Sequence, residues 1–225
     1  QALYSGQYVD ATYGADGLKR AFDRIVALPE EKSDNVGRVE RVREFSQGHF
    51  GEMLDAGTAP RVLDVGSGLC IFLHRLHRLT EWPCTALDPD ARAAAHASEV
   101  AGVTGVCADF MQASSLGRFG LVTFNKVLEH VKNPVAMLRH AHACLAMGGA
   151  VYVELPDGEA AAKEGEGREE FFIDHHHVFS RRSIRILAHS AGFEVIAVEA
   201  LCEPSRKFTL RAFLEPAKRE VVNAL

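Results

Sequence analysis

A glycine turn between two apolar segments constrains the fold of this chain more than any other feature. Residues 61–71 read RVLDVGSGLCI, a short apolar run containing Asp64, two glycines one residue apart, and then an apolar helical pattern. This order predicts a strand, a tight turn and a helix N-terminus. Glycine lets the backbone approach a ligand closely, and a helix start offers free N–H groups to an anion. We therefore expect Asp64, Gly66, Ser67 and Gly68 to bind a nucleotide-type cofactor.

Strand and helix patterns alternate along the chain after this turn. We expect strands at 61–65, 84–87, 105–108, 121–125 and 150–154, and helices at 71–79, 89–100 and 134–145, with a further helix at 36–54 before the turn. The polar segment 158–170 is expected to be an exposed loop, and a late helix through Ala191 is expected to have Ser180 as its N-cap and Gly192 at its C-terminal end. Alternation at this spacing builds βαβ units, so the predicted fold is α/β, a Rossmann-like, mostly parallel sheet with helices on both faces. Two later strands, 193–200 and 207–213, predict a C-terminal antiparallel hairpin that supplies one antiparallel edge strand.

The chain divides into two predicted parts. Residues 1–57 form an N-terminal helical cap and a helix that leads into the core, with Arg38, Arg41 and Arg43 on the solvent face of that helix. Residues 58–225 form the cofactor-binding core, in which 157–179 is a substrate loop. A chain of 225 residues, 47% of them hydrophobic, is long enough for one such core.

Composition limits the partners. A net charge of −5 argues against a nucleic-acid binder, and no apolar run reaches membrane-spanning length. The five cysteines are scattered and include no C-x-x-C pair, which is typical of reduced core residues in a cytoplasmic protein. The chain starts at Gln1 rather than Met, as a piece of a longer chain would. A homodimer is the other arrangement that we expect.

Acidic residues follow the second and third predicted strands. Asp88 lies about 20 residues past the glycine turn, where an acid can accept hydrogen bonds from both ribose hydroxyls of an adenosine cofactor. We expect Pro89, beside it, to line the cofactor site as well. Pro89 also suits the first position of a helix, so Asp88 could cap that helix, and the two roles of Asp88 can coexist. Asp109 could accept a hydrogen bond from the amino group of adenine, and Phe110 could cover one face of the adenine ring. The alternative is that Asp109 is an ordinary turn residue.

A loop with acid and base groups follows the fourth predicted strand. Asn125 and Lys126 begin it at the carboxyl edge of the sheet, where open α/β sheets bind ligands, and we expect both to face the cofactor. His130 could deprotonate a substrate hydroxyl because its pKa lies near neutral pH, with Glu129 in support. The alternative is that Glu129 and His130 only brace the loop.

Three consecutive histidines at 175–177 invite a metal-site interpretation. Consecutive side chains cannot all point one way, and no Cys/His cluster lies nearby in the sequence. We therefore predict no metal site.

The ordered motifs resemble those of the class I methyltransferases that use S-adenosylmethionine. They are LDVGSG at 63–68, Asp88, Asp109-Phe110, VLEH at 127–130 before Pro134, and Gly148-Gly149. The series covers about residues 36–200 and is similar to the small-molecule branch that includes ubiquinone-type and sugar O-methyltransferases. Where the family often has a third glycine, this chain has Cys70.

The resemblance implies roles for several residues. Gly66 and Gly68 would hold the methionine part of S-adenosylmethionine, Asp88 the ribose and Asp109 the adenine. The segment before the late helix would wall the substrate pocket, so His176 or His177 could contact substrate, with His176 a second candidate base. The N-terminal segment would fold over the cofactor, with the Tyr13 ring facing a polar substrate; the alternative is that the N-terminal tyrosines simply pack.

The expected reaction is methyl transfer to a small-molecule hydroxyl, first of all one on a sugar or sugar nucleotide. A quinone-type phenol or another small metabolite is the alternative acceptor. A nicotinamide-dependent oxidoreductase would share the glycine turn, but the next glycine and a Tyr-x-x-x-Lys pair are missing. A non-catalytic cofactor-binding module is the third hypothesis.

Overall fold

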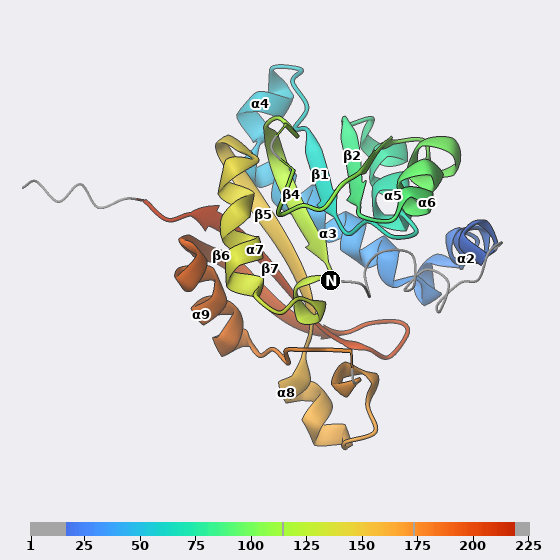
Figure 1. Ribbon diagram of the computed structural model, residues 1–225, viewed down its shortest axis with the longest axis vertical. Helices are drawn as coiled ribbons and strands as arrows, with labels where there is room; N and C mark the ends of the chain where they lie inside the picture. The colour runs from blue at the N-terminus through green and yellow to red at the C-terminus, as the bar shows by residue number, and fades with distance from the viewer. Residues whose placement is uncertain (1–16, 114, 173, 219–225) are drawn as a thin grey trace, which may run out of the picture.

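The computed structural model describes residues 17–113, 115–172 and 174–218, and Tyr13 lies outside them. In this part of the chain a seven-stranded sheet has the order β3-β2-β1-β4-β5-β7-β6 (Figure 1). The strands are β1 (Val62–Val65), β2 (Cys84–Asp88), β3 (Thr104–Cys107), β4 (Phe119–Asn125), β5 (Leu145–Pro156), β6 (Phe193–Cys202) and β7 (Phe208–Pro216). β1 to β5 are parallel, which confirms the Rossmann-like α/β prediction.

The C-terminal hairpin forms as predicted, but its antiparallel strand is not at the edge. β7 pairs antiparallel with both β5 and β6, so it lies inside the sheet and β6 forms the edge. Burial explains the order. Most of β7 is fully buried, whereas β6 is half-exposed along its length, and an apolar strand belongs in the sheet interior.

Helices cover both faces of the sheet, as predicted (Figure 1). Along β5, Val151 and Val153 face α7 and α9, whereas Tyr152 faces α3 and α5. Alternate residues of a buried strand thus contribute to two separate cores. The helices are α2 (Gly17–Val26), α3 (Asp34–His49), α4 (Gly51–Asp55), α5 (Ile71–Thr80), α6 (Ala91–His96), α7 (Pro134–His140), α8 (Gly158–Ala161) and α9 (Arg181–Ala191).

Several predicted helices have different ends. The helix expected over 36–54 is divided between α3 and α4 at Phe50, next to two glycines of low helix propensity. The helix expected over 134–145 ends earlier, because Leu145 already begins β5. α9 agrees closely with the prediction: Ser180 and Ser183 form its capping box, and Gly192 ends it with φ 85°.

Two of the three α3 arginines that were predicted to face solvent, Arg38 and Arg41, pair with acids of the sheet instead. Arg38 donates to both carboxylate oxygens of Glu154 at 2.7 and 2.5 Å, and Arg41 pairs with Glu199. Both acids lie on strands, so these arginines hold α3 to the sheet. The prediction was wrong because a row of polar residues on a helix is the same in sequence whether it faces water or the carboxylates of a neighbouring sheet.

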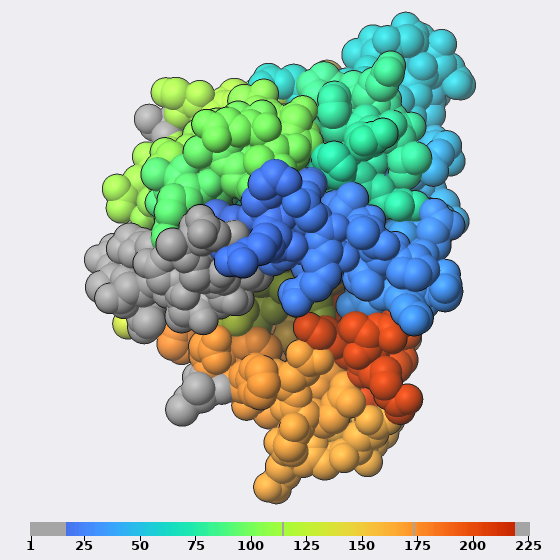
Figure 2. All heavy atoms as spheres, turned by 90° about the vertical axis from the view of Figure 1, so that its right-hand side faces the viewer, coloured from blue at the N-terminus to red at the C-terminus, as the bar shows by residue number. Residues whose placement is uncertain are grey.

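The segment expected as an exposed loop, 158–170, is partly ordered and anchored. Asp157 caps α8 through the N–H groups of Glu159 and Ala160, and Glu170 is buried against Arg168 and the Phe208 N–H. Figure 2 shows this orange segment below α2, with a hollow between it and the blue segment. Within the described residues, no helix combines the length and apolar character needed to cross a membrane.

Candidate active site

The glycine turn lies at the carboxyl end of β1, in the middle of the sheet between β2 and β4. Gly66 and Gly68 have φ values of 71° and 50°. A Cβ on Gly66 would lie 2.9 Å from Val127 Cγ2, whereas a Cβ on Gly68 would meet nothing within 4 Å. The first glycine therefore lets the 127–130 loop pack against the turn, and the second leaves bare backbone facing open space.

Asp88 ends β2 beside this turn. Its two carboxylate oxygens accept the N–H groups of Gly68 and Asp90, each at 2.9 Å. Burial raises the pKa of Asp88, and each oxygen keeps a further lone pair for a ligand hydroxyl. The helix-cap alternative for Asp88 is wrong: Asp90 caps α6 by accepting the Arg92 N–H at 2.8 Å, and Pro89 precedes the cap.

Asp64 braces the turn from inside. Its Oδ1 accepts from Thr123 Oγ1 at 2.6 Å and from Asn125 Nδ2 at 2.7 Å, which ties β1 to β4. Burial raises the pKa of Asp64 to about 6. Ser67 Oγ and Asn125 Oδ1 are buried and lack hydrogen-bond partners, so the edge of the sheet offers polar atoms that a bound ligand can satisfy.

Cys70 keeps the backbone of the turn in place at the position where the resemblance would put a third glycine. It adopts the left-handed conformation with φ 58°, and its N–H donates to the Ser67 carbonyl oxygen at 2.7 Å. Its side chain is 1% exposed and belongs to the core on the α3–α5 face of the sheet. The thiol therefore points away from the open side of the turn, and burial raises its pKa.

Asp109 and Phe110 have separate roles. Asp109 is exposed, and its carboxylate accepts from Met111 N and Gln112 Nε2 at 2.9 and 3.0 Å. Phe110 is 3% exposed, and its ring packs on those of Phe124 and His140. The structure thus places the Phe110 ring in the core, rather than where it would cover a ligand.

The side chains of Lys126 and Glu129, in the loop after β4, point in different directions. Lys126 has φ 58°, and its Nζ donates to Thr209 Oγ1 on β7 at 3.0 Å, so its side chain is committed to the sheet. Glu129 is 1% exposed, and its Oε2 has no hydrogen-bond partner. Burial raises the pKa of Glu129 to about 8, which favours the protonated form at neutral pH in the absence of a cation.

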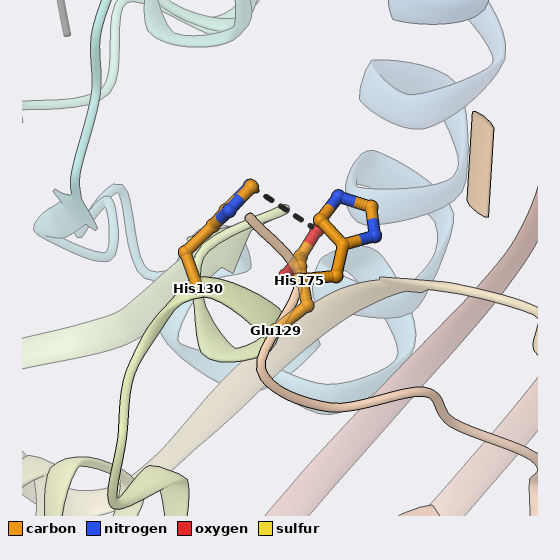
Figure 3. Close-up of side chains that lie close together, drawn as sticks. All are labelled: Glu129, His130 and His175. Atoms are coloured by element: carbon orange, nitrogen blue, oxygen red, sulfur yellow. Dashed lines mark ion pairs between the residues drawn. The ribbon is translucent and has the colours of Figure 1, made fainter. Parts of the chain in front are cut away.

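His130 and His175 converge on Glu129 from two segments (Figure 3). His130 Nε2 lies 4.0 Å from Glu129 Oε1, and the two imidazole rings meet edge to face with centroids 4.8 Å apart. The ring nitrogens Nδ1 of His130 and His175 contact the carbonyl oxygens of Asp174 and Glu170, at 3.2 and 2.9 Å. Burial lowers the pKa of His130, so its imidazole is neutral near pH 7.

The sequence analysis singled out His176 and His177, but the histidine of this segment that joins the cluster is His175. The backbone N–H groups of His176 and His177 donate to the Glu129 carbonyl oxygen at 2.7 and 3.3 Å. These bonds dock the 175–177 segment on the 127–130 loop and bring the His175 ring, not those of its neighbours, to Glu129. His176 is exposed, and His177 Nε2 is buried without a partner.

Sequence reasoning also missed a buried charge network beside the site. Arg38, Arg211 and the Tyr152 hydroxyl all contact the carboxylate of Glu154 at the end of β5, and Arg211 also pairs with Glu203 at 2.7 Å. A strand ending in Glu-Leu-Pro gave no sign that its acid would be fully buried.

Comparison with known proteins decides between the cofactor alternatives. A family model described as a methyltransferase domain matches residues 13–198, most of the chain. The chain belongs to the methyltransferase domain family. It is a class I enzyme that uses S-adenosylmethionine, and the nicotinamide and non-catalytic alternatives are set aside. The open glycine turn, the Asp88 carboxylate and the unsatisfied Ser67 and Asn125 oxygens fit that cofactor.

Solved structures share the fold of this methyltransferase. Magnesium protoporphyrin IX methyltransferase from Synechocystis PCC 6803 superposes with a TM-score of 0.63 at 15% identity, over 92% of this chain and 98% of that one. The N-methyltransferase NodS from Bradyrhizobium japonicum WM9 gives 0.58 at 15% identity, over 90% and 100%. The glycopeptide N-methyltransferase MtfA, complexed with sinefungin, gives 0.59 at 19% identity, over 80% and 87%. None of the curated proteins matches the sequence.

Proposed function

We propose that this methyltransferase methylates a hydroxyl group of a small molecule, first of all a sugar or sugar nucleotide. The observation that carries the proposal is the position of His130 beside the buried Glu129, in a loop packed on the glycine turn through Val127. A base next to the cofactor turn is what a hydroxyl acceptor needs, because the oxygen must lose its proton as it is methylated.

The cofactor residues follow from the geometry of the turn. Gly66, Ser67 and Gly68 hold the methionine part of S-adenosylmethionine, Asp88 accepts from the ribose hydroxyls and Asp109 from the adenine amino group. Bound there, the cofactor supplies an electrophilic methyl group. The protein aligns the acceptor oxygen with that methyl group and excludes water.

His130 accepts the proton in this proposal. With Nδ1–H donated to the Asp174 carbonyl oxygen, Nε2 is the basic nitrogen, and the lowered pKa keeps it unprotonated at neutral pH. Glu129 supports the ring from 4.0 Å. His176 is the second candidate base, since its exposed side chain lies on the segment docked against the same loop.

The acceptor class is supported by the polar character of segment 157–179, which we propose as the substrate loop. His176 is exposed and His177 Nε2 lacks a partner, so both can bind the hydroxyls of a sugar. A quinone-type phenol is the alternative, and the edge-to-face histidine rings would suit its aromatic plane. We further propose a cytoplasmic enzyme, in keeping with its five free cysteines.

A panel assay with radiolabelled S-adenosylmethionine tests the proposal. Nucleotide sugars, free sugars and quinols are offered as acceptors, and we expect incorporation into a sugar hydroxyl. His130→Ala should lower turnover by about 100-fold or more, while calorimetry shows unchanged affinity for S-adenosylhomocysteine. His176→Ala is the matched variant. A larger loss of turnover in His176→Ala than in His130→Ala would indicate that His176 is the base. Loss of cofactor affinity in His130→Ala would make His130 structural, and methylation of quinols alone would favour the alternative acceptor.

A further inference from the structure

We propose that Glu129, His130 and His175 form a binding site for one divalent transition-metal ion of the Zn²⁺ or Mn²⁺ type. The sequence predicted no metal site because three consecutive histidines cannot share one ion. In the folded chain, only His175 of that run lies in the cluster, and Glu129 and His130 of the 127–130 loop are the other two ligands (Figure 3).

The three side chains present one ligand atom each within a small volume. Their donor atoms all lie within 4.8 Å of one another, and the Glu129 carboxylate lies 4.0 Å from His130 Nε2. Ligands of one zinc ion bind it at about 2.0–2.2 Å, which places them roughly 3–3.5 Å apart. Small rotations of the two imidazole rings bring the atoms to that separation.

The buried carboxylate gives independent support for a cation. Glu129 is 1% exposed, yet its Oε2 has no hydrogen-bond partner. An unsatisfied carboxylate oxygen in the protein interior is costly, and a bound cation would compensate it. Lys126, the nearest cationic residue of the same loop, is directed to Thr209 at 3.0 Å.

The hydrogen bonds around the histidines are those of metal ligands. In known sites a ligating histidine donates its other ring N–H to a carbonyl or carboxylate, which fixes the ring and the tautomer. Both histidines meet this requirement, because Nδ1 of His130 contacts the Asp174 carbonyl oxygen and Nδ1 of His175 that of Glu170. In His130, Nε2 is the nitrogen that faces Glu129, and in His175 the contact of Nδ1 leaves Nε2 available as the ligand atom.

The donor set selects the class of ion. Two imidazoles and one carboxylate suit Zn²⁺, Mn²⁺, Fe²⁺ or Co²⁺, whereas Ca²⁺ and Mg²⁺ prefer sites built from oxygen alone. Three protein ligands leave at least one coordination position open, as in catalytic metal sites. Resting on the proposed function, we assign that position to an oxygen of the acceptor. In the metal-bound form His130 holds the ion, the ion lowers the pKa of the acceptor hydroxyl, and His176, the second candidate base, takes its proton.

Calorimetry on the full chain without a histidine tag, after treatment with a chelator, tests the site directly. Titration with ZnCl₂ and MnCl₂ should show one ion bound per chain. His175→Ala and Glu129→Gln should each weaken binding by about tenfold or more. His176→Ala is the matched control, since it removes a histidine of the same segment whose ring lies outside the cluster, and its metal affinity should be unchanged. Unchanged binding of S-adenosylhomocysteine shows that each variant is folded.

A Co²⁺-loaded sample adds a spectroscopic measurement. Its visible absorption should change in His175→Ala and not in His176→Ala. The proposal is overturned if no ion binds saturably, or if binding survives in both His175→Ala and Glu129→Gln. A different result would contradict the proposed function alone: metal and S-adenosylhomocysteine would bind normally, but no hydroxyl acceptor in the panel would be methylated.

Discussion

The backbone N–H of Gly68 donates to Oδ2 of Asp88 at 2.9 Å, so the turn after β1 and the acid that ends β2 form one unit. The bond positions a carboxylate, 9% exposed, against the open side of the glycine turn.

Replacement of Asp88 tests this unit. Asp88→Asn should weaken S-adenosylhomocysteine about 10- to 100-fold, because hydrogen bonds from the ribose hydroxyls to a charged acceptor contribute about 1.5–3 kcal/mol each. Asp90→Asn is the matched control, since asparagine also caps helices, and its affinity should stay within about twofold. Equal affinities for the wild type and Asp88→Asn, measured by calorimetry, would remove Asp88 from the ribose site.

The two glycines of the turn should respond differently to alanine. Gly66→Ala should lower the free energy of unfolding by about 1–3 kcal/mol, because positive φ and contact with Val127 both oppose a Cβ there. Gly68→Ala meets no protein atom within 4 Å, so its larger effect should be on cofactor affinity. Urea unfolding and calorimetry on the same samples separate the two effects. Wild-type affinity in Gly68→Ala would show that the cofactor does not approach this residue.

Arg38 should contribute strongly to stability. Burial alone would raise the pKa of Glu154, but Arg38 and the other cations hold it at about 2. Removing one partner of a buried pair leaves an uncompensated charge, so Arg38→Met should cost about 3 kcal/mol or more in urea unfolding. Arg43→Met, on the same helix, should stay within about 0.5 kcal/mol. A cost below 1 kcal/mol for Arg38→Met would mean that Arg211 and Tyr152 alone compensate Glu154.

Glu129 should make stability fall as pH rises. Its pKa is about 8 in the folded protein and about 4.5 when unfolded, so between these values the folded state holds a proton that the unfolded state has lost. The stabilisation is complete below pH 4.5 and is lost as the pH rises through 8. Without metal, Glu129→Gln should flatten the decline between pH 5 and 8 by up to about 1.4 kcal/mol per pH unit.

Urea unfolding in the presence of a chelator, at pH 5, 6, 7 and 8, measures this slope. Glu44→Gln changes an exposed glutamate of α3 and should keep the wild-type slope. Parallel slopes for Glu129→Gln and the wild type would show that Glu129 is ionised in the folded protein.

The cysteines should divide into two reactive and three protected thiols. Cys107 and Cys202 are exposed, whereas Cys70, Cys84 and Cys144 are buried, and burial raises the pKa of Cys84 to about 12. A thiol reagent at pH 8 should therefore modify two cysteines rapidly in the native protein and all five in denaturant. Mass spectrometry identifies the modified sites, and rapid modification of Cys70 would show that the turn opens.

Local patterns in the sequence determined the α/β class, the seven strands, the caps of α9 and the positions of the glycine turn, Asp88 and Asp109. Each of these depends on residues close together in the chain, where periodicity, turn chemistry and capping operate. Ordered motifs also sufficed to indicate the family, which the family comparison then showed.

Tertiary structure alone decided which distant groups meet. It placed β7 inside the sheet, buried Arg38 against Glu154, put the Phe110 ring in the core, and brought His175 rather than His176 to Glu129 and His130. These outcomes depend on burial and on contacts between residues 14 to 116 positions apart. A linear pattern cannot distinguish a polar side chain that faces water from one that faces a buried charge, because both are equally polar in sequence.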